Sequence, residues 1–170
     1  ILSICFAHQQ EEPSMTKPHL ACEPRLRRPG AEDGARVWAL VRACAPLDEN
    51  SLYANLLQCS HFRETCVLAE QNGEIVGWVS GYLRPDAPDT LFVWQVAVAA
   101  SARGQGLGLK MLRSLLARAA CGDVQRLETT ITADNAASWA LFERLADTLD
   151  AETGRRPHFT RSAHSTASTP

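Results

Sequence analysis

Residues 103–108 are the part of the sequence whose residue types and spacing most clearly serve chemistry. The run RGQGLG follows a β-rich segment and leads directly into a segment with helical periodicity. A helix start leaves several backbone N–H groups unpaired, with the positive end of the helix dipole behind them. Glycine has no Cβ, so a phosphate can approach this backbone closely. The run therefore predicts a cradle for a diphosphate, with Arg103 adding positive charge at its rim.

Other glycine motifs fit this run poorly. A P-loop ends in Gly-Lys-Ser/Thr, whereas Leu109 and Lys110 follow Gly108 here. A dinucleotide-binding fold normally carries its glycines after the first strand, with an acidic residue about 20 positions later. In this sequence the glycines follow a later strand of a mostly antiparallel opening. A tight turn that only packs a strand closely against a helix is the structural alternative to a ligand site.

Length and composition indicate an ordinary globular protein. The chain has 170 residues, of which 45% are hydrophobic and 21% charged, and this suits one domain with one core. The formal net charge of -2 gives no basic footprint, so we expect neither nucleic acid nor a membrane surface as partner. No apolar run approaches the roughly 20 residues that cross a bilayer.

The two ends of the chain are expected to lie outside the fold. The opening ILSICFAHQQ lacks the basic start and small-residue cleavage site of a signal peptide, and Met15 opens a polar, proline-punctuated stretch. We therefore expect a disordered leader over residues 1–24, one domain over residues 25–160, and a flexible tail over residues 161–170.

The cysteines are scattered along the chain. There are six, and they form neither a C-x-x-C pair nor a cysteine–histidine cluster with metal-ligand spacing. We expect reduced thiols in a cytosolic protein, and no bound metal.

The apolar periodicity sets the expected order of elements. Asn72-Gly73 tolerates the positive φ values of a tight primed turn and separates two β-rich runs, which predicts a hairpin. The expected elements are a strand at 25–30, helices at 31–44 and 47–59, the hairpin at 65–83, a strand at 89–100, a helix at 107–120, a strand at 124–132 and a helix at 135–149. This order predicts an α/β (α+β) domain whose mixed, mostly antiparallel sheet is flanked by helices.

Two of these segments carry more detailed expectations. The second helix is expected to turn Leu52, Leu56 and Leu57 inward, with Asp48 or Asn50 as its N-cap. The near-continuous apolar run at 89–100 is typical of a strand that is covered on both faces.

The stretch VAVAASARGQGLGLKML, residues 96–112, resembles the signature motif of the GCN5-related N-acetyltransferases (GNAT), Arg/Gln-x-x-Gly-x-Gly/Ala. Arg103, Gly106 and Gly108 stand at its three fixed positions, and the element order matches from about Arg25 to the last helix. The resemblance implies the GNAT fold and acetyl-CoA as cosubstrate, with the pantetheine arm on the strand before the glycines and the pyrophosphate on the loop amides. The implied contacts are Val96, Val98, Arg103, Gly104, Gln105, Gly106, Leu107, Gly108 and Asn135.

Longer stretches are similar to one branch of this family, the L-2,4-diaminobutyrate acetyltransferases of ectoine synthesis. They are PLDENSLYANLLQCSHFRETCVLAE, GWVSGYLRPDAPDTLFVWQVAV and TTITADNAASWALF, and the similarity runs from roughly Arg27 to Phe159. The resemblance implies acetyl transfer to the γ-amine of L-2,4-diaminobutyrate, which gives N-γ-acetyl-diaminobutyrate. It also implies a bacterial cytoplasmic homodimer that serves compatible-solute production.

An acceptor with two ammonium groups and a carboxylate needs an anion and hydrogen-bonding groups around it. By the resemblance, Asp48, Tyr53 and Trp94 are the residues expected to contact this substrate. Each has a structural alternative, since Asp48 could simply cap a helix and the two aromatic residues could belong to the core.

Proton handling is open at this stage. Many relatives carry a tyrosine in the helix after the asparagine and a carboxylate on the strand before the glycines, but this chain has Phe142 and Gln95 there. Glu128 and His158 are the candidate acid–base residues, and a structural role is an equal alternative for both. Two other functions stay open: a GNAT enzyme for another small amine or a peptide, and a non-catalytic acyl-CoA-binding module.

Overall fold

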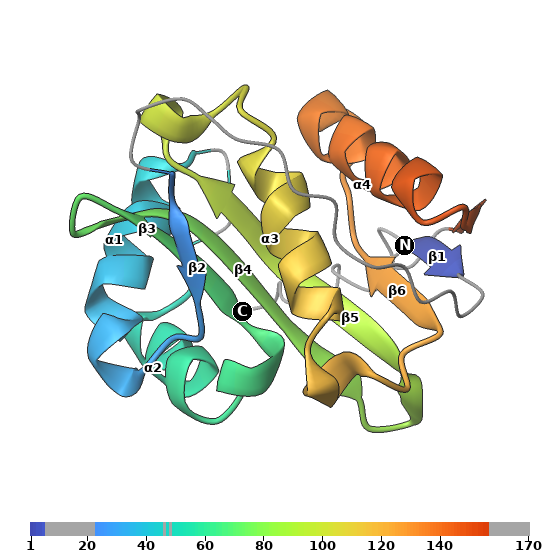
Figure 1. The fold of residues 1–170 in the computed structure, drawn as a ribbon, viewed down its shortest axis with the longest axis horizontal. Helices are drawn as coiled ribbons and strands as arrows, with labels where there is room; N and C mark the ends of the chain where they lie inside the picture. Colours follow the sequence, from blue (N-terminus) through green and yellow to red (C-terminus); the bar gives the residue numbers. More distant parts are fainter. Residues whose placement is uncertain (6–22, 46, 48, 157–170) are drawn as a thin grey trace, which may run out of the picture.

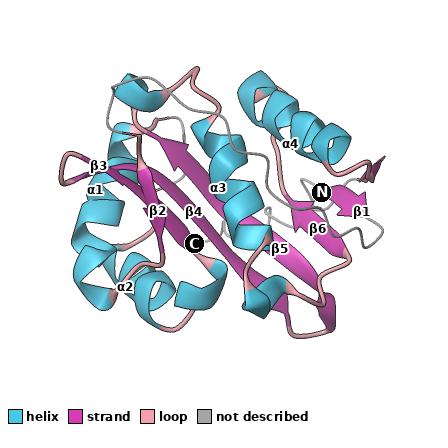
Figure 2. Cartoon of the chain, viewed as in Figure 1, coloured by secondary structure: helices cyan, strands magenta, loops and turns pink. Residues whose placement is uncertain are grey.

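A single mixed sheet organises the molecule (Figures 1 and 2). The structure is a computed structural model, and it describes residues 1–5, 23–45, 47 and 49–156. The strands are β1 Leu2–Cys5, β2 Arg25–Arg27, β3 Val67–Gln71, β4 Glu74–Arg84, β5 Ala87–Val98, β6 Arg126–Thr129 and β7 Glu152–Arg155. The helices are α1 Gly34–Ala43, α2 Leu52–Ser60, α3 Leu107–Leu116 and α4 Ala136–Thr148, with short 3₁₀ turns η1 Ala31–Asp33, η2 Arg63–Thr65, η3 Ala100–Ala102 and η4 Ala119–Cys121.

The strand order is β2-β3-β4-β5-β6-β1-β7, and every neighbouring pair is antiparallel except β5–β6. The predicted mixed, mostly antiparallel sheet is therefore confirmed. The hairpin is confirmed as well, because Asn72 and Gly73 join β3 to β4 with φ values of 52° and 80°. Figure 1 shows α3 running across the sheet, with α4 beside it.

Each face of the sheet carries its own layer of helices. On β4, Val79 belongs to a core cluster with side chains of α3 and α4, whereas its neighbour Trp78 belongs to a second cluster with side chains of α1 and α2. This division follows from the two-residue alternation of a strand, which sends successive side chains to opposite faces.

The predicted inward face of α2 is wrong. Leu52 is exposed, and the buried side chains of the helix are Asn55, Gln58 and Cys59. The helix packs against α1, η1 and η2, and Leu56 and Leu57 are only half-buried, so no single apolar stripe marks an inward side. The Nδ2 of Asn55 donates to Oε1 of Gln58 at 3.0 Å, which offsets part of the cost of burying two amides.

The expectation of a disordered leader is wrong for Leu2–Cys5. This segment forms β1 between β6 and β7, and Leu2 and Ile4 are fully buried. This four-residue segment becomes an interior strand only through partners more than 120 positions away, so local sequence gives no sign of it. Residues 6–22 and the predicted tail at 161–170 lie outside the described residues.

Candidate active site

Strands β5 and β6 separate halfway along β5, and among the described residues no strand pairs with this edge of β5 beyond Val93. Their parallel pairing covers only Thr90–Val93 of β5, while β5 itself continues to Val98. The Ala99 amide donates to the Val76 carbonyl of β4 at 2.9 Å. Because antiparallel pairing alternates, Val96 and Val98 turn their main-chain groups away from β4 and toward this edge. An extended chain with amide groups, such as a pantetheine arm, can add there as a further strand.

The glycine run lies immediately beyond this edge, and its glycines serve two purposes. Gly104 and Gly106 adopt φ values of +74° and +71°, and a Cβ added at either would meet nothing within 4 Å. Open space therefore faces a backbone in the left-handed region that favours glycine. Gly108 is different, because its Cβ would lie 3.3 Å from Leu141 of α4. Gly104 and Gly106 thus fit the predicted cradle, whereas Gly108 fits the alternative of close packing against a helix.

Side chains around the cradle are tied back to the fold, so that the loop presents its main chain outward. The Nε of Arg103 donates to the Val98 carbonyl at 3.0 Å, and Nε2 of Gln105 donates to the Ser101 carbonyl at 3.1 Å. Leu107, the first residue of α3, is buried in the core. The unpaired amides of the α3 N-terminus are the groups that remain for a diphosphate.

Asn135 stands at the start of α4 as its N-cap, with Oδ1 accepting a hydrogen bond from the Ser138 amide at 3.0 Å. Its side chain therefore has a structural role in this structure. The expected contact between Asn135 and the pantetheine stays a prediction.

On the opposite side of β5, a β-bulge presents Trp94. The register pairs Gln95 with Ser80 and Val93 with Gly81, which leaves Trp94 as the extra residue of β5. Trp94 is 50% exposed, so it is not a core residue. The expectation that this strand is covered on both faces is therefore wrong at this position. A bulge re-aims a side chain, and here it turns an indole outward.

Aromatic residues continue from Trp94 along the same region. Tyr82 of β4 lies with its ring centroid 6.4 Å from Trp94 and 5.3 Å from its cross-strand partner Phe92, and Phe62 lies 6.5 Å from Tyr82. The sequence reasoning missed Phe62, Tyr82 and Phe92. Facing aromatic residues on paired strands would have been the signal, but the bulge shifts the register that brings them together.

The segment that leads into α2 is connected to β5 through Asn50. Tyr53, in the first helical turn, is 68% exposed and so is not a core residue. Ser51 caps α2, since its Oγ accepts from the Ala54 amide at 3.1 Å, and the predicted cap by Asp48 or Asn50 is wrong. Asn50 instead donates from Nδ2 to Oε1 of Gln95 at 2.9 Å. Asp48 itself lies outside the described residues.

The candidate base Glu128 is held by two guanidinium groups. Its Oε2 accepts from Arg84 at 2.8 Å and its Oε1 from Arg156 at 2.9 Å, and the side chain is almost fully buried. A carboxylate with both oxygens paired in this way favours a structural role over proton transfer to an amine. Phe142 is packed in the core, and His158 lies outside the described residues.

The cysteines of the described residues are free thiols, in agreement with the prediction of reduced cysteines. Burial raises the pKa of Cys59 and of Cys66 to about 12, and that of Cys121 to about 11, so these thiols are neutral at physiological pH. Within the described part of the chain, no group of three or more His, Cys, Asp or Glu side chains is placed to hold a metal, and no helix is long and apolar enough to cross a membrane.

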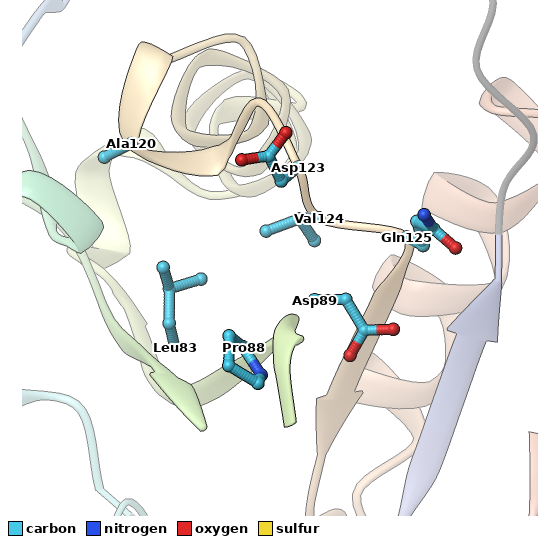
Figure 3. A pocket seen from close by; sticks show the side chains of 7 residues that line it. All are labelled: Leu83, Pro88, Asp89, Ala120, Asp123, Val124 and Gln125. Carbon is cyan, nitrogen blue, oxygen red and sulfur yellow. The ribbon is translucent and has the colours of Figure 1, made fainter. Parts of the chain in front are cut away.

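A separate open pocket of about 490 Å³ lies at the other end of α3, away from the glycine run (Figure 3). Leu83, Pro88 and Val124 supply apolar walls, with the carboxylates of Asp89 and Asp123 nearby. The pocket lies between the β4–β5 turn and the segment before β6. Neither the edge of β5 beyond Val93 nor the aromatic residues around Trp94 contribute to it.

A sheet that opens beside β5, next to a glycine-rich turn at the start of a helix, is the arrangement expected of an acyl-CoA-dependent N-acyltransferase. The profile of the acetyltransferase (GNAT) family matches residues 34–146, and the chain belongs to this family.

Similar proteins point to one branch of the family. The chain is 56% identical over 139 residues to the L-2,4-diaminobutyric acid acetyltransferase of Methylotuvimicrobium alcaliphilum, covering 82% of this chain and 81% of that one. It is 53% identical to the enzyme of the same name from Chromohalobacter salexigens, over 79% of this chain and 70% of that one. Among solved structures, the diaminobutyrate acetyltransferase from Paenibacillus lautus, in complex with its substrate L-2,4-diaminobutyric acid and coenzyme A, matches with a TM-score of 0.74 and 46% identity, covering 75% of this chain and 77% of that one.

Proposed function

We propose that this chain transfers the acetyl group of acetyl-CoA to the γ-amine of L-2,4-diaminobutyrate. The amine nitrogen bonds to the thioester carbonyl carbon, the carbon–sulfur bond breaks, and the products are N-γ-acetyl-diaminobutyrate, CoA and a proton. The observation that carries the proposal is the 56% identity, over four fifths of the chain, to a named diaminobutyrate acetyltransferase. We place the reaction in ectoine synthesis, in the bacterial cytoplasm.

The cofactor half of the site fits acetyl-CoA through its main chain. The open, left-handed backbone at Gly104 and Gly106 leaves room for a diphosphate on the amides at the start of α3. The edge at Val96 and Val98, which no described strand covers, suits the pantetheine amides, although the Val98 carbonyl already accepts from Nε of Arg103. Acetyl-CoA supplies an activated acyl group, and a β5 amide near Val96 is our candidate for stabilising negative charge on the acyl oxygen.

The acceptor half is proposed to consist of Asp48, Tyr53 and Trp94. The exposure of the two aromatic side chains supports this role, because each offers an apolar wall without belonging to the core. Asp48 supplies the anion that an ammonium group requires, on the resemblance alone.

Nucleophilic attack requires the neutral amine, so a proton must leave the acceptor before the bond forms. Gln95 cannot accept that proton, and both oxygens of Glu128 are engaged with arginines. We therefore propose that the proton leaves through water or through Asp48 or His158. Alignment of the amine with the thioester then supplies several kcal/mol of the barrier reduction.

A thiol-release assay tests the function directly. The chain is incubated with acetyl-CoA and, in parallel, diaminobutyrate, ornithine, lysine or a peptide, and free CoA is followed over time. We expect turnover with diaminobutyrate at a kcat/KM well above that for the other amines, and mass spectrometry with NMR should place the acetyl group on the γ-nitrogen. Faster turnover of another amine would assign a different acceptor, and acetyl-CoA binding without thiol release would indicate a non-catalytic module.

Asp48→Ala tests the proposed acceptor contact. We expect the KM for diaminobutyrate to rise at least about tenfold, because a charged partner of the ammonium group is lost, while the KM for acetyl-CoA changes little. Equal effects on both constants would remove Asp48 from the acceptor site.

We further propose that the chain works as a homodimer, on the resemblance to the diaminobutyrate acetyltransferases. Light scattering coupled to size exclusion should give about twice the 18.6 kDa chain mass, and a mass of one chain would contradict the proposal.

A further inference from the structure

The hydrogen bond between Asn50 and Gln95 is a connection across the acceptor region that the function proposed above does not use. Asn50 precedes α2, while Gln95 lies in β5 next to the bulge, 45 positions later. Nδ2 of Asn50 donates to Oε1 of Gln95 at 2.9 Å, and the Gln95 side chain is 94% buried. A hydrogen bond to a buried acceptor has a well-defined geometry, because alternative partners such as bulk water are excluded.

Gln95 is adjacent in sequence to the exposed Trp94, and Asn50 stands three positions before the exposed Tyr53. Ser51, which follows Asn50, caps α2, so the position of Asn50 sets where the first turn with Tyr53 begins. Gln95 follows Trp94 directly, and its pairing with Ser80 defines the bulge that turns the indole outward. The bond therefore joins the two elements that present Tyr53 and Trp94.

We propose that Gln95 is a positioning residue of the acceptor site: through Asn50 it holds the start of α2, and with it Tyr53, at a fixed place relative to Trp94. This inference rests on the proposed acceptor role of those two aromatic residues. It also gives a physical reason for an amide at Gln95, since an amide oxygen accepts the bond at every pH, without the cost of a buried charge.

The test is a double-mutant cycle with Asn50→Ala and Gln95→Met, a substitution that keeps the length of the side chain and removes its amide. Each single variant should raise the KM for diaminobutyrate about tenfold, because one hydrogen bond that orders the site is lost. The double variant should be no worse than Gln95→Met alone, since the bond from Asn50 is already lost in that variant. The KM for acetyl-CoA should stay within about twofold, because the cradle is built from other elements.

Ser80→Ala is the matched control. Ser80 lies directly opposite Gln95 and is equally buried, and its Oγ has no hydrogen-bond partner among the described residues. Removing a hydroxyl without a partner should leave both KM values and the melting temperature unchanged. Changes in Ser80→Ala equal to those in Gln95→Met would show that any disturbance of this layer has the same effect, and would overturn the assignment.

Amide hydrogen exchange supplies a readout that does not depend on the substrate. Asn50→Ala and Gln95→Met should each speed exchange at the start of α2 several-fold, with β3 unaffected. Faster exchange together with an enzyme that does not acetylate diaminobutyrate would uphold the link and reject the proposed function. Turnover of diaminobutyrate with an unchanged KM in both variants, or additive effects in the double variant, would reject the link. Asn50 is only half-buried, so Asn50→Ala is expected to fold. This variant alone still tests the link if Gln95→Met fails to fold.

Discussion

The two halves of the candidate site are built in different ways. The cofactor half, from Val96 to Gly108, uses main-chain groups of one continuous segment, and its side chains are tied back by bonds such as Arg103 to the Val98 carbonyl. The proposed acceptor half draws on side chains from α2 and β5, two elements that the hydrogen bond between Asn50 and Gln95 connects in the folded chain. A main-chain site is specified by backbone conformation and is therefore visible in a local run of glycines. A side-chain site depends on packing and register.

The largest expected difference in stability is between two tryptophans, Trp78 and Trp94. Trp78 is fully buried between β4 and the α1–α2 layer, whereas Trp94 is half exposed. Trp78→Ala should lower the free energy of unfolding by about 3–5 kcal/mol, because it leaves a large cavity. Trp94→Ala should lower it by less than about 1 kcal/mol but raise the KM for diaminobutyrate. Urea unfolding and steady-state kinetics of both variants would test this, and a loss of stability in Trp94→Ala as large as that in Trp78→Ala would place the indole in the core.

A substitution in the cradle should separate cofactor binding from stability. Gly106→Ala puts a Cβ at a φ of +71°, and Gly73→Ala does the same at +80° in the β3–β4 turn, with nothing within 4 Å of either Cβ. Both variants should lose about 1–2 kcal/mol of stability from the left-handed conformation. Only Gly106→Ala should raise the KM for acetyl-CoA, by about tenfold or more, since the Cβ stands where the diphosphate approaches. An equal rise in Gly73→Ala would mean that strain alone explains the effect.

A buried ion pair beside α2 should make the stability of the fold depend on pH. The guanidinium of Arg27 lowers the pKa of the buried Asp33, which lies in η1 against α2. A lowered pKa stabilises the fold above the unfolded value of about 3.9, and this contribution is lost as the pH falls through the folded value. Asp33→Asn should therefore cost about 1–3 kcal/mol at pH 7 and flatten the loss of stability below about pH 4.

Urea midpoints measured from pH 7 to pH 3 would check this prediction. Asp86→Asn is the matched control, because Asp86 also pairs with an arginine, Arg84, but is exposed to solvent. This variant should follow the wild-type curve at each pH. An acid limb in Asp33→Asn identical to that of the wild type would show that the ion pair contributes nothing.

Local patterns predicted those parts of the fold whose partners are near in sequence. Asn72-Gly73 identified the β3–β4 hairpin because its positive φ values are a local requirement. The same reasoning failed for α2, where packing on several sides buries Asn55 and Gln58 and leaves Leu52 exposed. It also failed for β1, which exists only because β6 and β7 flank it.

The sequence by itself determined the family, the order of elements from β2 to α4, and the glycine-rich turn before α3, because each depends on neighbouring residues and on backbone conformations that few residue types allow. Only the tertiary structure decided that Trp94 faces outward from a bulge, that Glu128 is held between two arginines, and that Asn50 binds Gln95. These features join residues up to 45 positions apart, and their geometry comes from the register of the strands and the packing of the helices, which no local pattern encodes.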